Sequence, residues 1–181
     1  MTAKTPAAKS RSTVKRSAGI LLFRGGSDDR GDSGELELLI VHPGGPLWAR
    51  KDTGAWSIPK GLVEHSDGEP AETDLDAARR EFTEETGAPA PDGPYLELGE
   101  VRQSGGKTVV AFAARGDLDP AEIVSNTFEM PWPPRSGRMQ SFPEIDRAEW
   151  MEPEKARAAL NPAQAEFVDR LLVALAESGG M

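Results

Sequence analysis

The feature that most constrains this chain is the segment Arg80–Gly87 (REFTEETG), which places three carboxylates directly before a glycine. On a helix, Glu81 and Glu85 lie four residues apart and share a face, and Glu84 lies three residues from Glu81. Like charges at this spacing repel one another, so they add nothing to an ordinary surface helix. A divalent cation would turn that repulsion into attraction, and Mg²⁺ favours a few carboxylates together with substrate phosphates. The segment therefore indicates a metal site.

A helix over residues 74–86 is predicted around this segment. Thr73 followed by Asp76 is a pattern that caps a helix start, and Gly87 suits the left-handed residue that follows a helix end. The segment Pro59–Gly61 upstream predicts a rigid turn that lets the backbone approach a bound ion or phosphate. The buried side of the helix is a narrow apolar stripe at helical spacing: Leu75, Ala78 and Phe82.

These residues resemble the signature of the Nudix hydrolase family. The family pattern is Gly, five residues, Glu, seven residues, Arg-Glu, an apolar residue, any residue, Glu-Glu, any residue, Gly and an apolar residue. Residues 80–88 match its second half without a gap. In the first half, taking Gly61 as the family glycine leaves five extra residues, so the signature spans residues 61–88 with an insertion. The glutamate that orients the signature arginine is then either Glu69 or Glu72, with Glu72 slightly favoured because it adjoins the helix cap.

The resemblance implies an α/β fold, the Nudix-type α/β/α sandwich with a mixed β-sheet between helices. It also implies that Glu81, Glu84 and Glu85 bind Mg²⁺ (or Mn²⁺), together with a backbone carbonyl near Gly61. Oxygen ligands of this kind are the ones that Mg²⁺ prefers.

The same resemblance implies a catalytic group of Glu81, Glu84, Arg80 and Glu144, in which Arg80 orients a glutamate of the signature. In several members of the family a glutamate outside the signature, a few residues before a strand tryptophan, joins the metal site. Glu144 fits that position and Glu129 fits it less well, while an ordinary surface glutamate is the alternative interpretation. The general base is then Glu81 or Glu144.

The activity that the resemblance implies is Mg²⁺-dependent hydrolysis of a nucleoside diphosphate linked to another group. Dinucleoside polyphosphates and nucleoside triphosphates are favoured, and inositol pyrophosphates stay open. The alternative is a module that binds nucleotides or regulates without turnover, for which the enlarged loop is the only support. A calcium-binding or structural metal protein is excluded by the lack of a loop with alternating oxygen ligands.

Two further stretches carry residues suited to substrate binding. The loop over residues 43–53 holds Trp48 and Arg50, and Lys60 follows it as a point charge for a phosphate. An exposed loop with one anchoring tryptophan is the competing interpretation of the first stretch.

The second stretch, residues 126–143, contains four prolines, which argue against regular structure. Its Trp132 suits stacking on a base, and Arg135 and Arg138 suit paired hydrogen bonds to phosphates. Here the competing interpretation is a structural loop that packs on its own apolar residues.

Composition limits the remaining possibilities. The chain of 181 residues suits one domain, predicted over residues 18–181, after a disordered basic tail over residues 1–17. The absence of cysteine excludes disulfides and thiolate chemistry, and two histidines exclude a histidine-rich metal site. The net charge of -9 argues against long nucleic acids as partners. No apolar run approaches the roughly 18 residues of a membrane span, so a cytoplasmic location is expected. The oligomeric state stays open.

Periodicity predicts the other elements. Strands are expected over residues 18–24, 36–42, 55–58, 95–103 and 107–115, and a short helical turn near 117–123. Helices are expected over 153–160 and 162–177. The second of these presents an apolar side that is assigned to the core: Ala165, Val168, Leu171, Leu172 and Leu175.

Overall fold

The structure is a computed structural model that describes residues 15–26 and 34–178. The basic tail predicted at the amino terminus lies mostly outside these ranges. Its last two residues do not belong to a tail, because the first strand, β1, runs from Arg16 to Arg24. Arg16 forms an ion pair of 2.6 Å with Asp74, the first residue of the signature helix, so this end of the chain is fastened to the helix.

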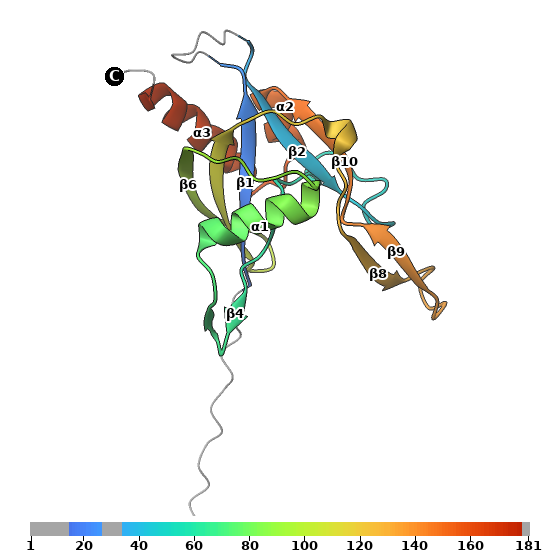
Figure 1. The fold of residues 1–181 in the computed structure, drawn as a ribbon. Helices are drawn as coiled ribbons and strands as arrows, with labels where there is room; N and C mark the ends of the chain where they lie inside the picture. Colours follow the sequence, from blue (N-terminus) through green and yellow to red (C-terminus); the bar gives the residue numbers. More distant parts are fainter. Residues whose placement is uncertain (1–14, 27–33, 179–181) are drawn as a thin grey trace, which may run out of the picture.

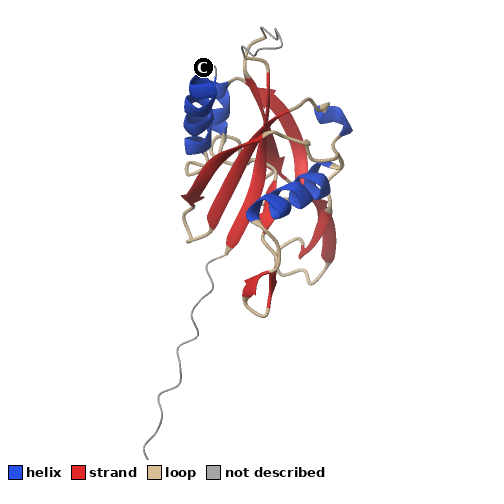
Figure 2. Ribbon diagram, turned by 60° about the vertical axis from the view of Figure 1, so that its left-hand side comes forward, coloured by secondary structure: helices blue, strands red, loops and turns tan. Residues whose placement is uncertain are grey.

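A mixed sheet forms the centre of the molecule (Figures 1 and 2). Its strand order is β10-β2-β1-β7-β6, and the short β3 pairs with β1. The strand β1 runs parallel to β7 and antiparallel to β2 and β3. The bounds of its strands are β2 Glu37–Pro43, β3 Lys60–Leu62, β6 Tyr95–Arg102, β7 Thr108–Arg115 and β10 Ile145–Met151.

Helices cover both faces of this sheet (Figure 2). Helix α1 (Asp74–Thr86) lies on one face, where Ile20 and Leu22 of β1 pack with Phe82. Helices α2 (Pro153–Ala159) and α3 (Ala165–Ser178) belong to the core cluster of the other face, where Leu21 packs with Phe167. Because β1 is buried on both sides, successive residues alternate between the two cores. The predicted α/β/α sandwich with a mixed sheet is confirmed.

Two smaller hairpins lie outside the main sheet. Strands β4 (His65–Ser66) and β5 (Glu69–Pro70) form one within the signature loop. Strands β8 (Thr127–Pro131) and β9 (Met139–Pro143) form the other, which extends away from the sheet in Figure 1. A short 3₁₀ helix, η1 (Pro120–Glu122), occupies the predicted helical turn.

The prediction of irregular structure over residues 126–143 is wrong, because β8 and β9 form a regular antiparallel pair. The four prolines do not interrupt this ladder. Pro131 and Pro143 end the two strands, and Pro133 and Pro134 lie in the connection between them. Prolines at strand ends and in turns cost no ladder hydrogen bond that the hairpin needs.

Two other predictions need correction. Residues 55–58 form isolated bridges, Val41 with Ser57 and Trp56 with Leu160, and not a strand. On α3, Leu172 is 36 % exposed, whereas Phe167 is fully buried. The buried side of α3 is therefore rotated towards Phe167. Over the residues that the structure describes, no helix combines the length and the apolar character needed to cross a membrane.

Candidate active site

The signature helix has the ends that its sequence predicts. The Thr73 hydroxyl accepts a hydrogen bond from the Asp76 amide at 3.1 Å, which caps the first turn. Gly87 adopts a φ of 74°, and its amide donates to the Thr83 carbonyl. Between these ends, Phe82 is buried against the sheet. The carboxylates of the helix therefore face the loop that precedes the helix in the sequence.

Arg80 joins the signature loop to the helix. Its guanidinium donates to both carboxylate oxygens of Glu72, at 2.6 and 3.2 Å, and to the Leu62 carbonyl at 3.0 Å. It also donates to Glu81 at 2.8 Å and reaches Glu84 at 3.4 Å. Arginine donors in a fork of this kind fix the position of a carboxylate as well as its charge. Glu72 is thus the glutamate that holds the signature arginine in this structure.

The part of the signature loop in which the sequence predicts an insertion folds back on itself. Between Leu62 and Glu72 the chain forms the β4–β5 hairpin, with Asp67 and Gly68 in its turn at φ values of 52° and 85°. Positive φ at two successive residues is typical of tight hairpin turns, where Asp-Gly is favoured. Because the hairpin extends away from the sheet (Figure 1), Glu72 still reaches Arg80.

Two of the three signature glutamates rest against the backbone of β3. The Lys60 amide donates to a carboxylate oxygen of Glu85 at 2.8 Å. At Gly61, an added Cβ would lie 1.9 Å from Oε2 of Glu81. Any other residue at position 61 would displace that carboxylate, so the glycine lets Glu81 lie close to the backbone of β3.

These side chains share one cavity of about 450 Å³. The three signature glutamates and Glu144 line it, so residues 60 positions apart in the sequence meet at one place. Two lysines and two aromatic residues also line the cavity: Lys60, Lys107, Trp48 and Phe128.

The charges in the cavity are partly withdrawn from water, which changes their protonation. Burial raises the pKa of Glu85 to about 7, against the opposing effect of Lys60. Burial also raises the pKa of Glu81, although its hydrogen bond from Arg80 acts in the opposite direction. Glu144 lies near enough to both carboxyls to raise their pKa further. A positively charged ligand would favour the ionised form of these clustered carboxyls.

The basic residues respond in a matching way. Burial, together with the neighbouring charge of Lys60, lowers the pKa of Lys107 to about 8. The hydrogen bond from Arg80 lowers the pKa of Glu72, so that pair stays charged. The cavity therefore holds several carboxylates that repel one another and two lysines that repel each other. This arrangement is suited to a cation and a phosphate bound together.

The donor set fits Mg²⁺ or Mn²⁺ in its chemistry. Carboxylate oxygens are hard ligands, and a cation would offset the burial and the mutual repulsion that together raise the pKa of Glu81 and Glu85. Within residues 15–26 and 34–178, however, no three acidic or histidine side chains already converge on one point. Arg80 holds Glu81 and Glu84 by hydrogen bonds, so both carboxylates would have to turn to receive a metal.

The residues predicted to bind substrate divide into two groups. Trp48 and Lys60 line the cavity, and Trp48 is 38 % exposed at its edge. Among the described residues that line it, Arg50, Arg135 and Arg138 are absent. Arg135 and Arg138 lie in the connection of the β8–β9 hairpin, beyond the sheet in Figure 1.

Among the lining residues that the sequence interpretation missed, Lys107 and Phe128 are the charged and the aromatic one. Lys107 precedes β7 directly after a glycine turn, and no local pattern distinguishes it from a surface lysine. Phe128 lies in the stretch that was interpreted as irregular. Its ring packs on Phe142 across the hairpin, and an added Cβ at Gly45 would lie 2.8 Å from it. An alternating pattern over residues 127–131 was the signal that could have identified it.

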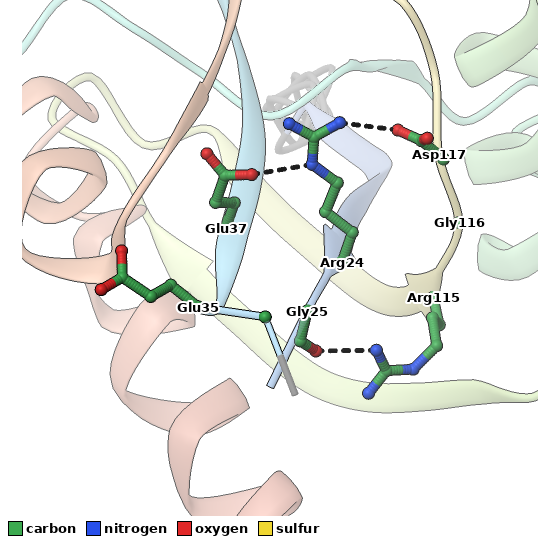
Figure 3. Close-up of a pocket in the computed structure, with 8 residues that line it drawn as sticks. Arg24, Gly25, Glu35, Glu37, Arg115, Gly116 and Asp117 are labelled. Carbon is green, nitrogen blue, oxygen red and sulfur yellow. Dashed lines mark hydrogen bonds and ion pairs between the residues drawn. The ribbon is translucent and has the colours of Figure 1, made fainter. Parts of the chain in front are cut away.

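A second cavity, of about 580 Å³, lies where β1 and β7 end (Figure 3). Arg24 points between Glu37 and Asp117 and donates to each at 2.8 Å, and Arg115 donates to the Gly25 carbonyl. These groups are engaged with one another. The arrangement stabilises the ends of the strands.

The molecule is an α/β/α sandwich in which an acidic helix borders a cavity that also holds lysines. Comparison with known proteins then gives the family. The NUDIX domain matches residues 14–171, so the chain belongs to the Nudix family, whose hydrolases act on phosphoanhydride bonds. The recognition made from the sequence is confirmed.

Solved structures agree with this fold. An Ap4A hydrolase of C. elegans, in a binary complex, is 19 % identical, with a TM-score of 0.56 and coverage of 89 % of this chain and 98 % of that one. The NUDIX domain of Shewanella oneidensis NrtR, complexed with ADP ribose, is 14 % identical, with a TM-score of 0.55 and coverage of 88 % and 87 %.

RenU, a Nudix hydrolase of M. smegmatis, is 22 % identical, with a TM-score of 0.53 and coverage of 91 % of this chain and 87 % of that one. At these identities the likeness concerns the fold. No curated protein matches the chain at a significant level.

Proposed function

We propose that this protein is a Mg²⁺-dependent (or Mn²⁺-dependent) pyrophosphohydrolase that cleaves a nucleoside diphosphate linked to another group. The observation that carries the proposal is the single cavity that joins the signature glutamates to two lysines and two aromatic rings. A phosphoanhydride needs positive charge on its oxygens and an activated water, and the cavity offers groups for both.

Each residue has a role that follows from its contacts. Glu81, Glu84 and Glu85 bind the cation, together with the backbone carbonyl at Gly61. When bound, the cation supplies positive charge against the phosphate oxygens. Arg80 holds Glu81 by the hydrogen bond of 2.8 Å until the cation takes that carboxylate, and Arg80 is itself fixed by Glu72.

Glu81 or Glu144 accepts the proton of the attacking water. The new P–O bond forms as the anhydride P–O bond breaks, and the leaving phosphate departs with the electron pair. Lys60 and Lys107 bind the phosphate oxygens as point charges. Because burial holds the pKa of Lys107 near 8, part of its charge is lost above that pH unless a phosphate restores it.

Dinucleoside polyphosphates and nucleoside triphosphates are the favoured substrates. Trp48 and Phe128 offer flat apolar surfaces at the cavity, on which a nucleobase stacks and an inositol ring does not. The descriptions of two similar structures name compounds with a nucleobase, Ap4A and ADP ribose. Both compounds contain a nucleoside diphosphate linked to another moiety. A small-molecule nucleotide is the proposed partner, and no long nucleic acid is expected because the net charge is -9.

The test is a product-release panel with Mg²⁺ that covers dinucleoside polyphosphates, nucleoside triphosphates, nucleotide sugars and inositol pyrophosphates. Turnover of the first two classes is expected, with a loss of at least about 100-fold in E84Q. Turnover of inositol pyrophosphates alone would reject the nucleotide substrate, and turnover of none would reject the enzyme.

The alternative is a nucleotide-binding or regulatory module without turnover. One observation favours it: Arg80 already occupies oxygens of Glu81 and Glu84. Calorimetric binding of ADP ribose without any product release would support this alternative. The cytoplasmic location expected from the sequence stays a prediction.

A further inference from the structure

His42 is a fully buried ionisable residue that the proposed chemistry does not use. It lies at the end of β2, next to Pro43, and its ring is 0 % exposed. Its Nδ1 lies 2.7 Å from a carboxylate oxygen of Asp146 on β10. Its Nε2 lies 2.7 Å from the backbone carbonyl of Lys51, in the loop that follows β2.

These two partners determine the protonation of the ring. A backbone carbonyl only accepts hydrogen bonds, so Nε2 must carry a hydrogen. The Asp146 carboxylate also accepts, and the Arg147 guanidinium lies 3.9 Å from it. A neutral imidazole has a hydrogen on only one nitrogen and would leave a lone pair facing one of the two oxygens. With Asp146 ionised, hydrogen bonding on both sides requires the imidazolium.

Asp146 reaches this position through an irregularity of the sheet. The register between β10 and β2 shifts between Ile145 and Arg147, which leaves Asp146 as the extra residue. Bulges of this kind redirect a side chain, and they often lie beside active sites. Here the redirected carboxylate meets the buried ring of the neighbouring strand.

The charges around the ring are balanced. Arg147 lies 5.0 Å above the ring of Trp56 and 3.7 Å from Asp52. The indole of Trp56 packs edge-on to His42 at 5.2 Å and donates to Asp52 at 2.6 Å. Two cations, His42 and Arg147, therefore face the carboxylates of Asp52 and Asp146. The ammonium of Lys51 lies over the ring of Trp48.

The network holds the loop that carries Trp48. The Lys51 amide donates to the Trp48 carbonyl at 2.8 Å, and the Lys51 ammonium lies 4.8 Å from the Trp48 ring. Since His42 holds the carbonyl of Lys51, a direct chain of contacts runs from β10 to the aromatic wall of the cavity. The loop residues themselves are exposed from Leu47 to Thr53, and Asp52 is the other loop residue that the network holds, through Trp56 and Arg147.

We propose that His42, as a buried imidazolium, is a positioning residue that holds the 43–53 loop so that Trp48 lines the substrate cavity. The proposal rests on the proposed function only in that Trp48 contacts the substrate. The hold on the loop and the charge of the ring are properties of the folded protein alone, and they are measured without any substrate.

The first experiment uses the unaltered protein. The chain has two histidines, His42 and His65, so nitrogen NMR of the imidazoles resolves them, and H65Q assigns the signals. We expect both nitrogens of His42 to be protonated at pH 7, with both hydrogens protected from exchange. A neutral ring with one protonated nitrogen would overturn the proposal.

The second experiment separates the two hydrogen bonds. In H42N the amide resembles Nδ1 and retains only the bond to Asp146, whereas in H42Q it resembles Nε2 and retains the bond to Lys51. H42N should speed hydrogen exchange of the Lys51 amide at least about tenfold, and H42Q less, because a lost charge-assisted hydrogen bond weakens the loop's hold. H65Q, altered in the β4–β5 hairpin, should leave that exchange unchanged. Equal exchange in H42N and the unaltered protein would contradict the proposal.

Kinetics add a readout that a merely structural role would not move. With any substrate that the panel identifies, H42N should raise KM about tenfold with kcat within about twofold, and H42Q should restore most of KM. A fall in kcat with unchanged KM would overturn the positioning role. If the unaltered protein turns over nothing, the proposed function fails, while the NMR and exchange results still decide the role of His42.

Discussion

Replacement of Glu85 by glutamine should stabilise the metal-free protein at neutral and higher pH. Burial raises the pKa of Glu85 to about 7 from an ordinary 4.5. In the unfolded chain this carboxyl ionises near pH 4.5, whereas in the folded chain it keeps its proton until about pH 7. The free energy of unfolding therefore falls as the pH rises through this window, because the folded state binds more protons.

The size of the effect follows from the two pKa values. At about 1.4 kcal/mol for each pH unit, the penalty reaches about 3 kcal/mol above pH 7 and stays below about 1 kcal/mol at pH 5. Glutamine keeps the acceptor for the Lys60 amide and carries no charge. For a domain of this size, E85Q should melt about 6–12 °C above the unaltered protein at pH 8, and close to it at pH 5.

The assay is thermal unfolding with a chelator present, at pH 5 and pH 8. E84Q is the matched control, since the Glu84 side chain is 43 % exposed, and it should follow the unaltered protein at both values. Adding Mg²⁺ at pH 8 should raise the melting temperature of the unaltered protein and not that of E85Q. A difference between E85Q and the unaltered protein that is the same at both pH values would refute the reasoning.

Three further predictions concern the same cavity. G61A should lower turnover at least about 100-fold with Mg²⁺ present, because the new methyl group collides with the carboxylate that faces it; activity near normal would contradict this. E72Q should lower kcat about tenfold or more, because Arg80 loses its ionic partner, while E69Q in the hairpin should not; steady-state kinetics decide between them. The double variant R135A and R138A should leave KM within about twofold, and a large rise would return these arginines to the substrate site.

The sequence was sufficient where one local pattern determines one local structure. Helix α1 begins and ends where Thr73 and Gly87 place it. The reason is that capping and a left-handed glycine act within one turn of chain. The parallel pairing of β1 and β7 was not among the predictions, since it depends on contacts between residues about 90 positions apart.

The site was predictable only in part for the same reason. The signature glutamates are close in sequence, so a helix brings them together whatever the rest of the chain does. Lys107 and Phe128 enter the cavity from separate elements, and only the assembled sheet determines that they face it. Arg135 and Arg138 illustrate the opposite error. Their side chains are suited to binding phosphate, but they lie in the connection of the β8–β9 hairpin and do not line the cavity.

The choice between Glu69 and Glu72 illustrates the limit of spacing arguments. Both glutamates fit the signature once an insertion is allowed, and only the β4–β5 hairpin decides which of them reaches Arg80. The hairpin closes the inserted segment on itself, so the residue that follows it returns to the helix. The Asp67-Gly68 pair favours such a turn, although the pattern alone does not determine which glutamate reaches Arg80.

The central claim is that the signature glutamates bind a divalent cation beside a phosphoanhydride. Diffraction from crystals soaked in manganese tests it most directly, since the anomalous signal locates the ion without reference to any protein model. The account predicts a peak bounded by carboxylate oxygens of Glu81, Glu84 and Glu85 and the backbone at Gly61, with Glu81 and Glu84 turned away from Arg80. Saturating manganese that leaves this place without a peak, with both carboxylates still on Arg80, would contradict it.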